Sequence, residues 1–265
     1  MSQHADIQLD LPESPEPSAV IDELTGAFIR HGGDEAYLKG MEMVVPGAGK
    51  VYGIRVPALR KMAKQVVCHY IGNDDALAEI AEASWNVHSR EHELVSVFIL
   101  GNLRGLAPSE RWNYGTRFLP GVTNWESCDQ LCAALLGQAL AEDPGCMDLL
   151  EGWVENENFW VRRAALVATV YLRRARYDDE IVKALDARTL NMCEMLLDDD
   201  EKYIHKAVDW AVREVIKRHY NLAFAWMLAR AESGLSSTAR SILNLAAKKL
   251  EEEDRTRLLE ILYRD

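Results

Sequence analysis

The chain has 265 residues, of which 48% are hydrophobic, and a formal net charge of −12 at pH 7. This length allows one large domain or two small ones, with a core that needs neither disulfides nor metal. The acidic balance argues against nucleic-acid binding through a uniformly basic surface. The acids are concentrated, however, in residues 1–30 and in the runs that start at Asp198 and Glu251. Local basic clusters remain in the rest of the chain.

The N-terminal segment, MSQHADIQLDLPESPEPS, lacks the basic and apolar regions of a signal peptide. Because prolines and acids dominate it, we expect residues 1–18 to form a flexible acidic arm, disordered or loosely docked. No run approaches the roughly 18 apolar residues of a membrane span. The five cysteines include no CxxC pair, which suits a reducing compartment. The sequence therefore predicts a soluble cytoplasmic protein without membrane contact.

From residue 19 to residue 265, helical periodicity dominates and no convincing alternating strand is found. Long helices are predicted to begin near Ser89, Asn124, Asn158, Lys202 and Ser236. These starts recur every 34 to 44 residues, with a shorter helix between each pair. This period is typical of HEAT-like repeats, whose helix pairs bury their apolar faces by stacking on neighbours. We predict an all-α, HEAT-like solenoid of about six repeats, a single domain with a concave binding surface.

The stretch HSREH, from His88 to His92, matches an inverted zinc-peptidase pattern with two histidines and an adjacent glutamate. Such a site needs a third protein ligand from a later helix, and the other histidines form no obvious partner set. Two histidines on one helix are more often ordinary surface or core residues. We therefore expect no metal and no cofactor.

Three successive repeat helices each carry a tryptophan with a charged residue one turn away: Trp125 with Asp129, Trp160 with Arg163, and Trp210 with Lys206. In a solenoid, equivalent helix positions face the same side, so these groups are predicted to converge on one concave patch. The alternative for each pair is ordinary packing against the next repeat.

The helix from Lys202 separates two stripes. The apolar stripe holds Ile204, Val208, Ala211, Val212 and Val215, and the second stripe holds Lys202, Lys206, Trp210, Arg213 and Lys217. The basic stripe either packs its tryptophan on the next repeat, with lysines extending around it, or forms a binding face in which the cations contact phosphates.

Two other features have structural interpretations. Cys128 and Cys132 are predicted to be core thiols on the helix that carries Asp129. The stretch VPGAGK at Val45 lacks the full phosphate-loop pattern and a preceding strand, so it does not indicate a nucleotide site. The acidic runs are expected to be solvated loops.

Ordered motifs over most of the chain, from about Tyr37 to Ala247, resemble the AlkD-type DNA alkylation-repair glycosylases, which are HEAT-like solenoids. The motifs are YGIRVPALRKMAK (Tyr52 to Lys64), SWNVHSREHEL (Ser84 to Leu94), TNWESCDQL (Thr123 to Leu131), NFWVRRAA (Asn158 to Ala165) and KYIHKAVDWAVRE (Lys202 to Glu214). The resemblance places HSREHE on a repeat helix and accounts for it without zinc.

The resemblance implies roles for individual residues. It implies catalytic positions at Asp129, Trp125 and Trp210 and DNA-binding positions at Tyr37, Arg163 and Lys206. The basic stripe of the helix from Lys202 adds Arg213 as a predicted DNA-binding residue. The resemblance also implies a monofunctional glycosylase that excises cationic bases, such as 3-methyladenine and 7-methylguanine, from double-stranded DNA without flipping the base into a pocket. We expect the protein to act as a monomer.

The chain also departs from the family pattern. Between Leu38 and Tyr52 it carries GMEMVVPGAGKV, a longer connection than expected, and Glu126 and Cys128 are unusual neighbours for Asp129. Some members of the family bind DNA with little or no glycosylase activity. The alternative is therefore a noncatalytic HEAT-repeat module whose concave face binds DNA structures or a partner protein.

Overall fold

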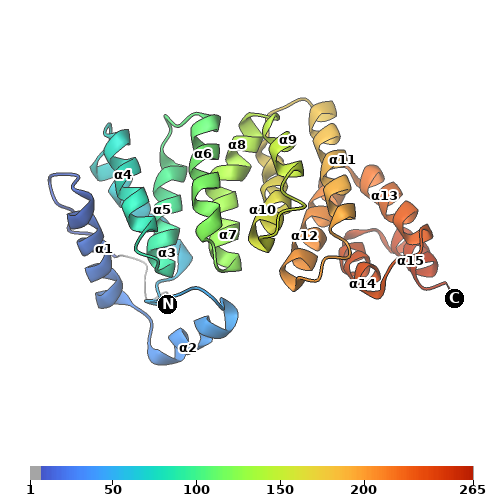
Figure 1. Cartoon of the computed structure of the whole chain (residues 1–265), viewed down its shortest axis with the longest axis horizontal. Coiled ribbons are helices and arrows are strands. Elements are labelled where there is room, and N and C mark those ends of the chain that lie inside the picture. Colours follow the sequence, from blue (N-terminus) through green and yellow to red (C-terminus); the bar gives the residue numbers. More distant parts are fainter. Residues whose placement is uncertain (1–6, 265) are drawn as a thin grey trace. The chain divides into compact units, whose positions relative to one another are not determined.

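The computed structural model describes residues 7–264 as a succession of helices (Figure 1). In chain order they are α1 (Pro17–His31), α2 (Glu35–Val44), α3 (Val56–His69), α4 (Asp74–Trp85), α5 (Arg90–Asn102), α6 (Pro108–Phe118), η1 (Leu119–Gly121), α7 (Trp125–Leu131), η2 (Cys132–Leu136), α8 (Gly137–Glu142), α9 (Cys146–Glu151), α10 (Phe159–Thr169), η3 (Val170–Arg174), α11 (Asp179–Met195), α12 (Lys202–Arg218), α13 (Tyr220–Glu232), α14 (Ser237–Ala246), η4 (Ala247–Lys249) and α15 (Glu252–Leu262). Within residues 7–264 no strand forms, and isolated bridges join Gly49 and Lys50 to Ser89. The predicted all-α fold is confirmed.

The chain divides into two compact units, with the boundary between Leu136 and Gly137. The sequence predicts one repeat domain over residues 19–265. In a repeat protein each helix pair packs mainly on its neighbours, so local packing is sufficient to define such units.

In unit 1, α5 packs against both α3 and α4, and α1 packs against α4. The core between these helices includes Leu24, Leu59, Ile80 and Leu94. Helix α5 is buried along most of its length, and its burial extends to the polar residues of its first turn. Charged residues are rarely buried unless they are paired, so this burial indicates that the first turn of α5 forms polar contacts with other parts of the protein.

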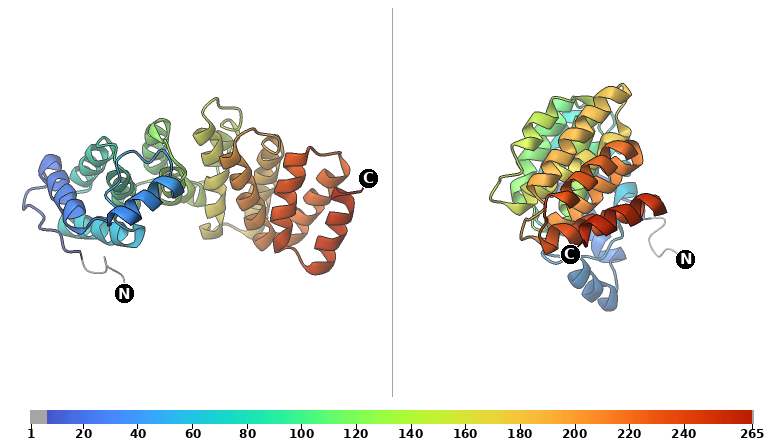
Figure 2. Two further views of the ribbon diagram at one scale, coloured as in Figure 1. Left: turned by 90° about the horizontal axis from the view of Figure 1, so that it is seen from below. Right: turned by 90° about the vertical axis from the view of Figure 1, so that its right-hand side faces the viewer.

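In unit 2, α12 is the central helix and packs against α10, α11, α13 and α14. The views in Figure 2 show the helices from α11 to α15 side by side. The apolar stripe predicted for α12 is buried throughout, from Ile204 to Val215. This part of the prediction is confirmed.

All five predicted helix starts are confirmed. Ser89, Asn124, Asn158 and Ser236 each accept a hydrogen bond from a backbone N–H of the following helix, and α12 begins at Lys202. Side-chain oxygens at these positions satisfy N–H groups that the first helical turn leaves unpaired. The expectation of a shorter helix between each pair is wrong for α11, which has 17 residues, as many as α12. No glycine or proline interrupts Asp179–Met195, so α11 continues.

The described part of the N-terminal arm lies against α3. Gln65 accepts a hydrogen bond from the N–H of Leu9 at 3.1 Å and donates to the carbonyl of Ile7 at 2.7 Å. The Tyr70 hydroxyl donates to the carbonyl of Pro12 at 2.6 Å. The segment from residue 7 to the start of α1 at Pro17 is thus docked, whereas residues 1–6 of the predicted flexible arm lie outside the described residues.

Across residues 7–264, no helix combines the length and the apolar character needed to cross a membrane.

Candidate functional site

Helix α7 carries the predicted catalytic pair: Asp129 lies one turn after Trp125, which begins the first turn. Asn124 caps this turn by accepting a hydrogen bond from the N–H of Ser127 at 2.9 Å. The Thr123 hydroxyl donates to the carbonyl of Gly47 at 2.6 Å, which ties the entry of α7 to the loop after α2. Gly47 has φ +85°, and a Cβ there would lie 2.4 Å from the Thr123 carbonyl oxygen, so only glycine fits this contact.

Trp125 is half-buried and anchors this loop. Its indole N–H donates to the carbonyl of Val44 at 2.8 Å. The ring packs against a small apolar cluster of Met41, Val45 and Ala48, against which Tyr37 also packs. The structure therefore brings together two predicted site residues, Tyr37 and Trp125. It also explains the long connection after Leu38, which supplies the surface that holds the indole.

Asp129 lies one turn after Trp125 and keeps 8% of its surface exposed. Cys128 and Cys132, beside it in sequence, are fully buried, as predicted for core thiols. A carboxylate with so little exposure is held in a low-dielectric setting, where its charge acts strongly on nearby groups.

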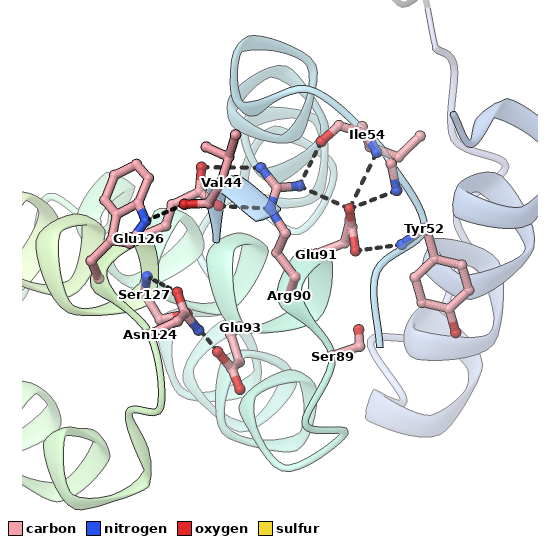
Figure 3. Close-up of polar contacts among 12 residues, drawn as sticks. Val44, Tyr52, Ile54, Ser89, Arg90, Glu91, Glu93, Asn124, Glu126 and Ser127 are labelled. Carbon is pink, nitrogen blue, oxygen red and sulfur yellow. Dashed lines mark hydrogen bonds and ion pairs between the residues drawn. The ribbon is translucent and has the colours of Figure 1, made fainter. Parts of the chain in front are cut away.

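A buried ion-pair network fixes α7 against α5 (Figure 3). Arg90 donates to both carboxylate oxygens of Glu126, at 2.6 and 3.1 Å, and to Glu91 at 2.8 Å. Burial alone would lower the pKa of Arg90, but hydrogen bonds and charge attraction from Glu126 and Glu91 more than offset this and raise it. A bidentate pair of this kind sets the orientation of the helix that carries Asp129.

Glu91 extends the network to the segment before α3 (Figure 3). Its carboxylate accepts hydrogen bonds from the backbone N–H groups of Tyr52, Gly53 and Ile54, at 2.9, 3.0 and 3.2 Å. The Arg90 guanidinium also donates to the carbonyl of Ile54 at 2.8 Å. One helical turn of α5 thus holds both the segment at residues 52–54 and α7.

The HSREH stretch is used for these packing contacts. His92 is fully buried, its Nδ1 lies 2.6 Å from the Ser89 hydroxyl, and its Nε2 lies 3.0 Å from the Thr25 hydroxyl. Burial lowers the pKa of His92 to about 4, so the ring is neutral at physiological pH. Within residues 7–264 no group of three potential ligands could hold a metal ion. The zinc-peptidase interpretation therefore has no support in the described structure.

Glu93 forms a second contact between α5 and α7 (Figure 3). Its carboxylate accepts a hydrogen bond from the Ser127 hydroxyl at 2.6 Å, and the Asn124 side-chain amide donates to the same hydroxyl at 3.1 Å. Burial raises the pKa of Glu93 to about 7, although the bond from Ser127 opposes this shift. The sequence alone does not predict that Arg90, Glu91 and Glu93 hold α7 and the segment at residues 52–54 in place. The sequence signal that could have indicated this role is the run of charged residues Arg90 to Glu93, which is followed in the same helix by apolar residues.

In unit 2, Arg163 and Trp160 are interior residues. Arg163 is 4% exposed and donates through Nη1 to the backbone carbonyl of Tyr203. Trp160 is 7% exposed and packs on Phe159 and Tyr203, with ring centroids 4.5 and 5.0 Å apart. Trp160 was predicted to present its ring on a binding surface, but it supports the packing of α10 on α12. Arg163 likewise has little surface to offer a phosphate.

The basic stripe of α12 has two different halves. Lys206 is exposed and Trp210 is half-buried, as a binding surface requires. Arg213, in contrast, forms a two-point ion pair with Asp209, at 2.9 and 3.1 Å, and Lys217 pairs with Glu214 at 2.5 Å. Burial raises the pKa of Asp209, and Arg213 opposes this shift. Neighbouring carboxylates therefore neutralise the second half of the stripe.

The predicted site residues are divided between the units. Unit 1 holds Tyr37, Trp125 and Asp129, and unit 2 holds Arg163, Lys206, Trp210 and Arg213. Each group lies on helices whose local packing is described above. The convergence of the two groups on one concave patch stays a prediction.

Solved structures and one protein family are similar to this chain. A solved structure titled "Predicted DNA alkylation repair enzyme from Enterococcus faecalis" is similar at 20% identity and a TM-score of 0.66, over 83% of this chain and 98% of that chain. A designed armadillo repeat protein in complex with the peptide (KR)4 matches at 15% identity and a TM-score of 0.33, over 95% of this chain and 87% of that chain. Comparison with the curated proteins gives no match. A sequence model for the family described as DNA alkylation repair enzyme matches residues 27–250, and the chain therefore belongs to that family.

Proposed function

We propose that the protein is a monofunctional DNA glycosylase that removes positively charged alkylated purines, such as 3-methyladenine and 7-methylguanine. The observation that carries the proposal is the nearly buried carboxylate of Asp129, one turn after the half-buried indole of Trp125. Both lie on a helix that a buried ion pair, Arg90–Glu126, holds in place. Membership in the DNA alkylation repair enzyme family supports DNA as the substrate.

Alkylation at a ring nitrogen gives the purine a positive charge and makes it a good leaving group. When the N-glycosidic bond breaks, the base leaves with the bonding electrons and becomes neutral, and the sugar develops oxocarbenium character. In our proposal, Asp129 stabilises this cation and accepts a proton from the water that attacks the anomeric carbon. The products are the free base and an abasic site. This chemistry needs no amine nucleophile and no flipping of the base into a pocket.

Aromatic and cationic residues complete the proposed site. The rings of Trp125, Trp210 and Tyr37 face the cationic nucleotide, with about 0.5–2 kcal/mol from each desolvated cation–π contact. Lys206 binds a flanking phosphate. Arg213 binds the same phosphate after its ion pair with Asp209 is broken. For Arg163 we propose an indirect role: its bond to the Tyr203 carbonyl fixes the start of α12, close to Lys206 in sequence.

The proposal is tested by measuring release of 7-methylguanine from methylated duplex DNA. Wild type is expected to release the base, and Asp129→Asn is expected to be slower by about 100-fold or more, the usual contribution of a general base. Asp75→Asn, an exposed aspartate at the start of α4, serves as the matched control and is expected to resemble wild type.

Two outcomes would contradict the proposal. Absence of release by wild type would rule out the enzyme and leave the noncatalytic DNA-binding module. Equal release by wild type and Asp129→Asn would remove Asp129 from the chemistry.

A further inference from the structure

Three aromatic rings form a cluster where α10 begins next to α12. The Tyr203 ring lies nearly parallel to that of Phe159, at an interplanar angle of 8° and a centroid distance of 6.2 Å. It also contacts Trp160 at 5.0 Å. Trp160 is buried, whereas Phe159 and Tyr203 remain half-exposed. The outer part of this cluster is therefore a supported aromatic surface at the start of α12.

Two lysines approach the same ring. The Nζ atoms of Lys202 and Lys206 lie 5.3 and 5.9 Å from the centroid of Tyr203, and both side chains are exposed. In the part of the chain that the structure describes, neither lysine forms an ion pair. Like charges four residues apart on a helix repel each other. An anion bound between them would remove this repulsion.

Among the described residues, no acid of the run before α12 forms an ion pair with these lysines. Asp199 accepts two hydrogen bonds from Arg162, at 2.7 and 3.2 Å, and Asp198 accepts one from Ser236. Two of the four acids in the run from Asp198 to Glu201 therefore form hydrogen bonds with other parts of the protein. The expectation that this run is only a solvated loop is corrected. Among residues 7–264, neither of the remaining two acids, Asp200 and Glu201, pairs with a lysine of this cluster.

The backbone under the aromatic surface is also fixed. The buried Arg163 donates to the carbonyl of Tyr203 itself, so the residue that carries the ring cannot shift without breaking a charge-assisted hydrogen bond. A ring with a supported face and a restrained backbone loses little conformational entropy when a ligand binds.

We propose that Tyr203, with Lys202 and Lys206, contacts one nucleotide of a nucleic-acid strand. The two ammonium groups hold its phosphate, and the Tyr203 ring contacts its sugar or base. Proteins that follow a single strand combine these two elements, cations for the backbone and aromatic rings for successive nucleotides. The inference rests on the proposed DNA substrate and adds Tyr203 and Lys202 to the contact surface of unit 2.

The test measures binding of a fluorescein-labelled, unmodified DNA duplex and of its single strand by fluorescence anisotropy. Tyr203→Leu is expected to weaken binding by about fivefold or more, as loss of one aromatic contact does, and Tyr203→Phe is expected to restore most of it. Lys202→Ala is expected to reduce the slope of log affinity against log salt by about 0.9 for the duplex and about 0.7 for the single strand.

Two controls separate this contact from general effects. Tyr263→Leu replaces an exposed tyrosine after α15, and Lys183→Ala replaces an exposed lysine on α11; both are expected to bind DNA as wild type does. A labelled polyglutamate peptide measures charge alone, and its weak binding is expected to be insensitive to Tyr203→Leu. Thermal melts followed by circular dichroism identify any variant that has lost its fold. If Tyr203→Leu is unfolded, DNA binding by Tyr203→Phe and by Lys202→Ala, which changes an exposed residue, decides the result.

The outcomes distinguish this inference from the proposed function. Unchanged DNA binding by Tyr203→Leu and Lys202→Ala would overturn the inference, even if wild type releases 7-methylguanine. Equal loss of polyglutamate and DNA binding on Tyr203→Leu would also overturn it. Conversely, absence of base release together with Tyr203-dependent DNA binding would reject the glycosylase and retain the contact.

Discussion

Glu93 is a buried carboxylate whose charge state is linked to the first turn of α7 through Ser127. Burial raises its pKa from 4.5 to about 7. Because the folded state holds this proton more tightly than the unfolded chain does, the stabilising contribution is complete below about pH 4.5 and is lost as pH rises through 7. His92 has the opposite sign, since burial lowers its pKa to about 4 and its contribution is lost as pH falls below 6.5.

Replacing Glu93 with glutamine isolates the first of these effects. Glu93→Gln mimics the protonated carboxyl, so the difference in stability between this variant and wild type should grow in favour of the variant from pH 4.5 to 7, up to on the order of 3 kcal/mol. Urea unfolding at a series of pH values measures it. A difference that stays constant over this range would show that Glu93 does not titrate there.

Trp125 shows how one residue can serve two purposes. Its indole N–H binds the carbonyl of Val44, while its ring packs on the cluster that includes Met41 and Val45. The sequence predicted a helix start and an indole beside a carboxylate. It contained no sign that the long connection after Leu38 supplies both the hydrogen-bond acceptor and the apolar contact.

At the scale of elements, α7 is held from several directions. Its first turn is capped by Asn124, and it is attached to α5 by the Arg90–Glu126 pair and by the bond from Ser127 to Glu93. Glu126, an unusual neighbour for Asp129 in the sequence, is thus half of a buried ion pair. Polar residues in buried positions are expected to be paired, and the partner here lies on another helix.

The network predicts an order of stability losses. Arg90→Gln leaves Glu126 buried without its guanidinium and should destabilise the protein by about 3–5 kcal/mol. Glu126→Gln retains an acceptor for Arg90, which also keeps Glu91, so its loss should be about 1–3 kcal/mol. Urea unfolding followed by circular dichroism compares the two. Equal losses, or a larger loss for Glu126→Gln, would contradict the assignment of Arg90 as the centre of the network.

Helix α12 shows that the spacing of residues along one helix does not determine which charged side chains pair with each other. Its apolar stripe is buried as predicted, but its basic stripe is divided by the Asp209–Arg213 and Glu214–Lys217 pairs. Both partner acids were present in the sequence. Their pairing depends on side-chain directions and on burial, which spacing alone does not specify.

For the whole molecule, the net charge of −12 is a poor guide to DNA binding. Phosphate contacts act over roughly a Debye length, about 8–10 Å in physiological salt, so a local cluster can bind while distant acids are screened. Lys206 is an exposed cation of such a cluster, beside Lys202 and Tyr203.

Lys206→Ala tests this local view. DNA affinity of wild type should fall steeply with salt, and the variant should lose about 0.9 of the slope of log affinity against log salt. Lys183→Ala, on α11, provides a lysine of equal charge outside the cluster and should keep the wild-type slope. Anisotropy titrations over a salt series measure both. An unchanged slope for Lys206→Ala would remove this residue from the DNA contact.

The sequence by itself determined the all-α class, the five helix starts and the buried stripe of α12. These features are local, because a capping side chain reaches only the next turn and an apolar stripe repeats every three or four residues. The tertiary structure decided the hydrogen-bond partners of Arg90, Glu126, Trp125 and Arg163. Their partners lie 36 residues apart for Arg90 and Glu126, 81 for Trp125 and Val44, and 40 for Arg163 and Tyr203. Contacts over such separations exist only once helices have packed, and no local pattern in the chain encodes them.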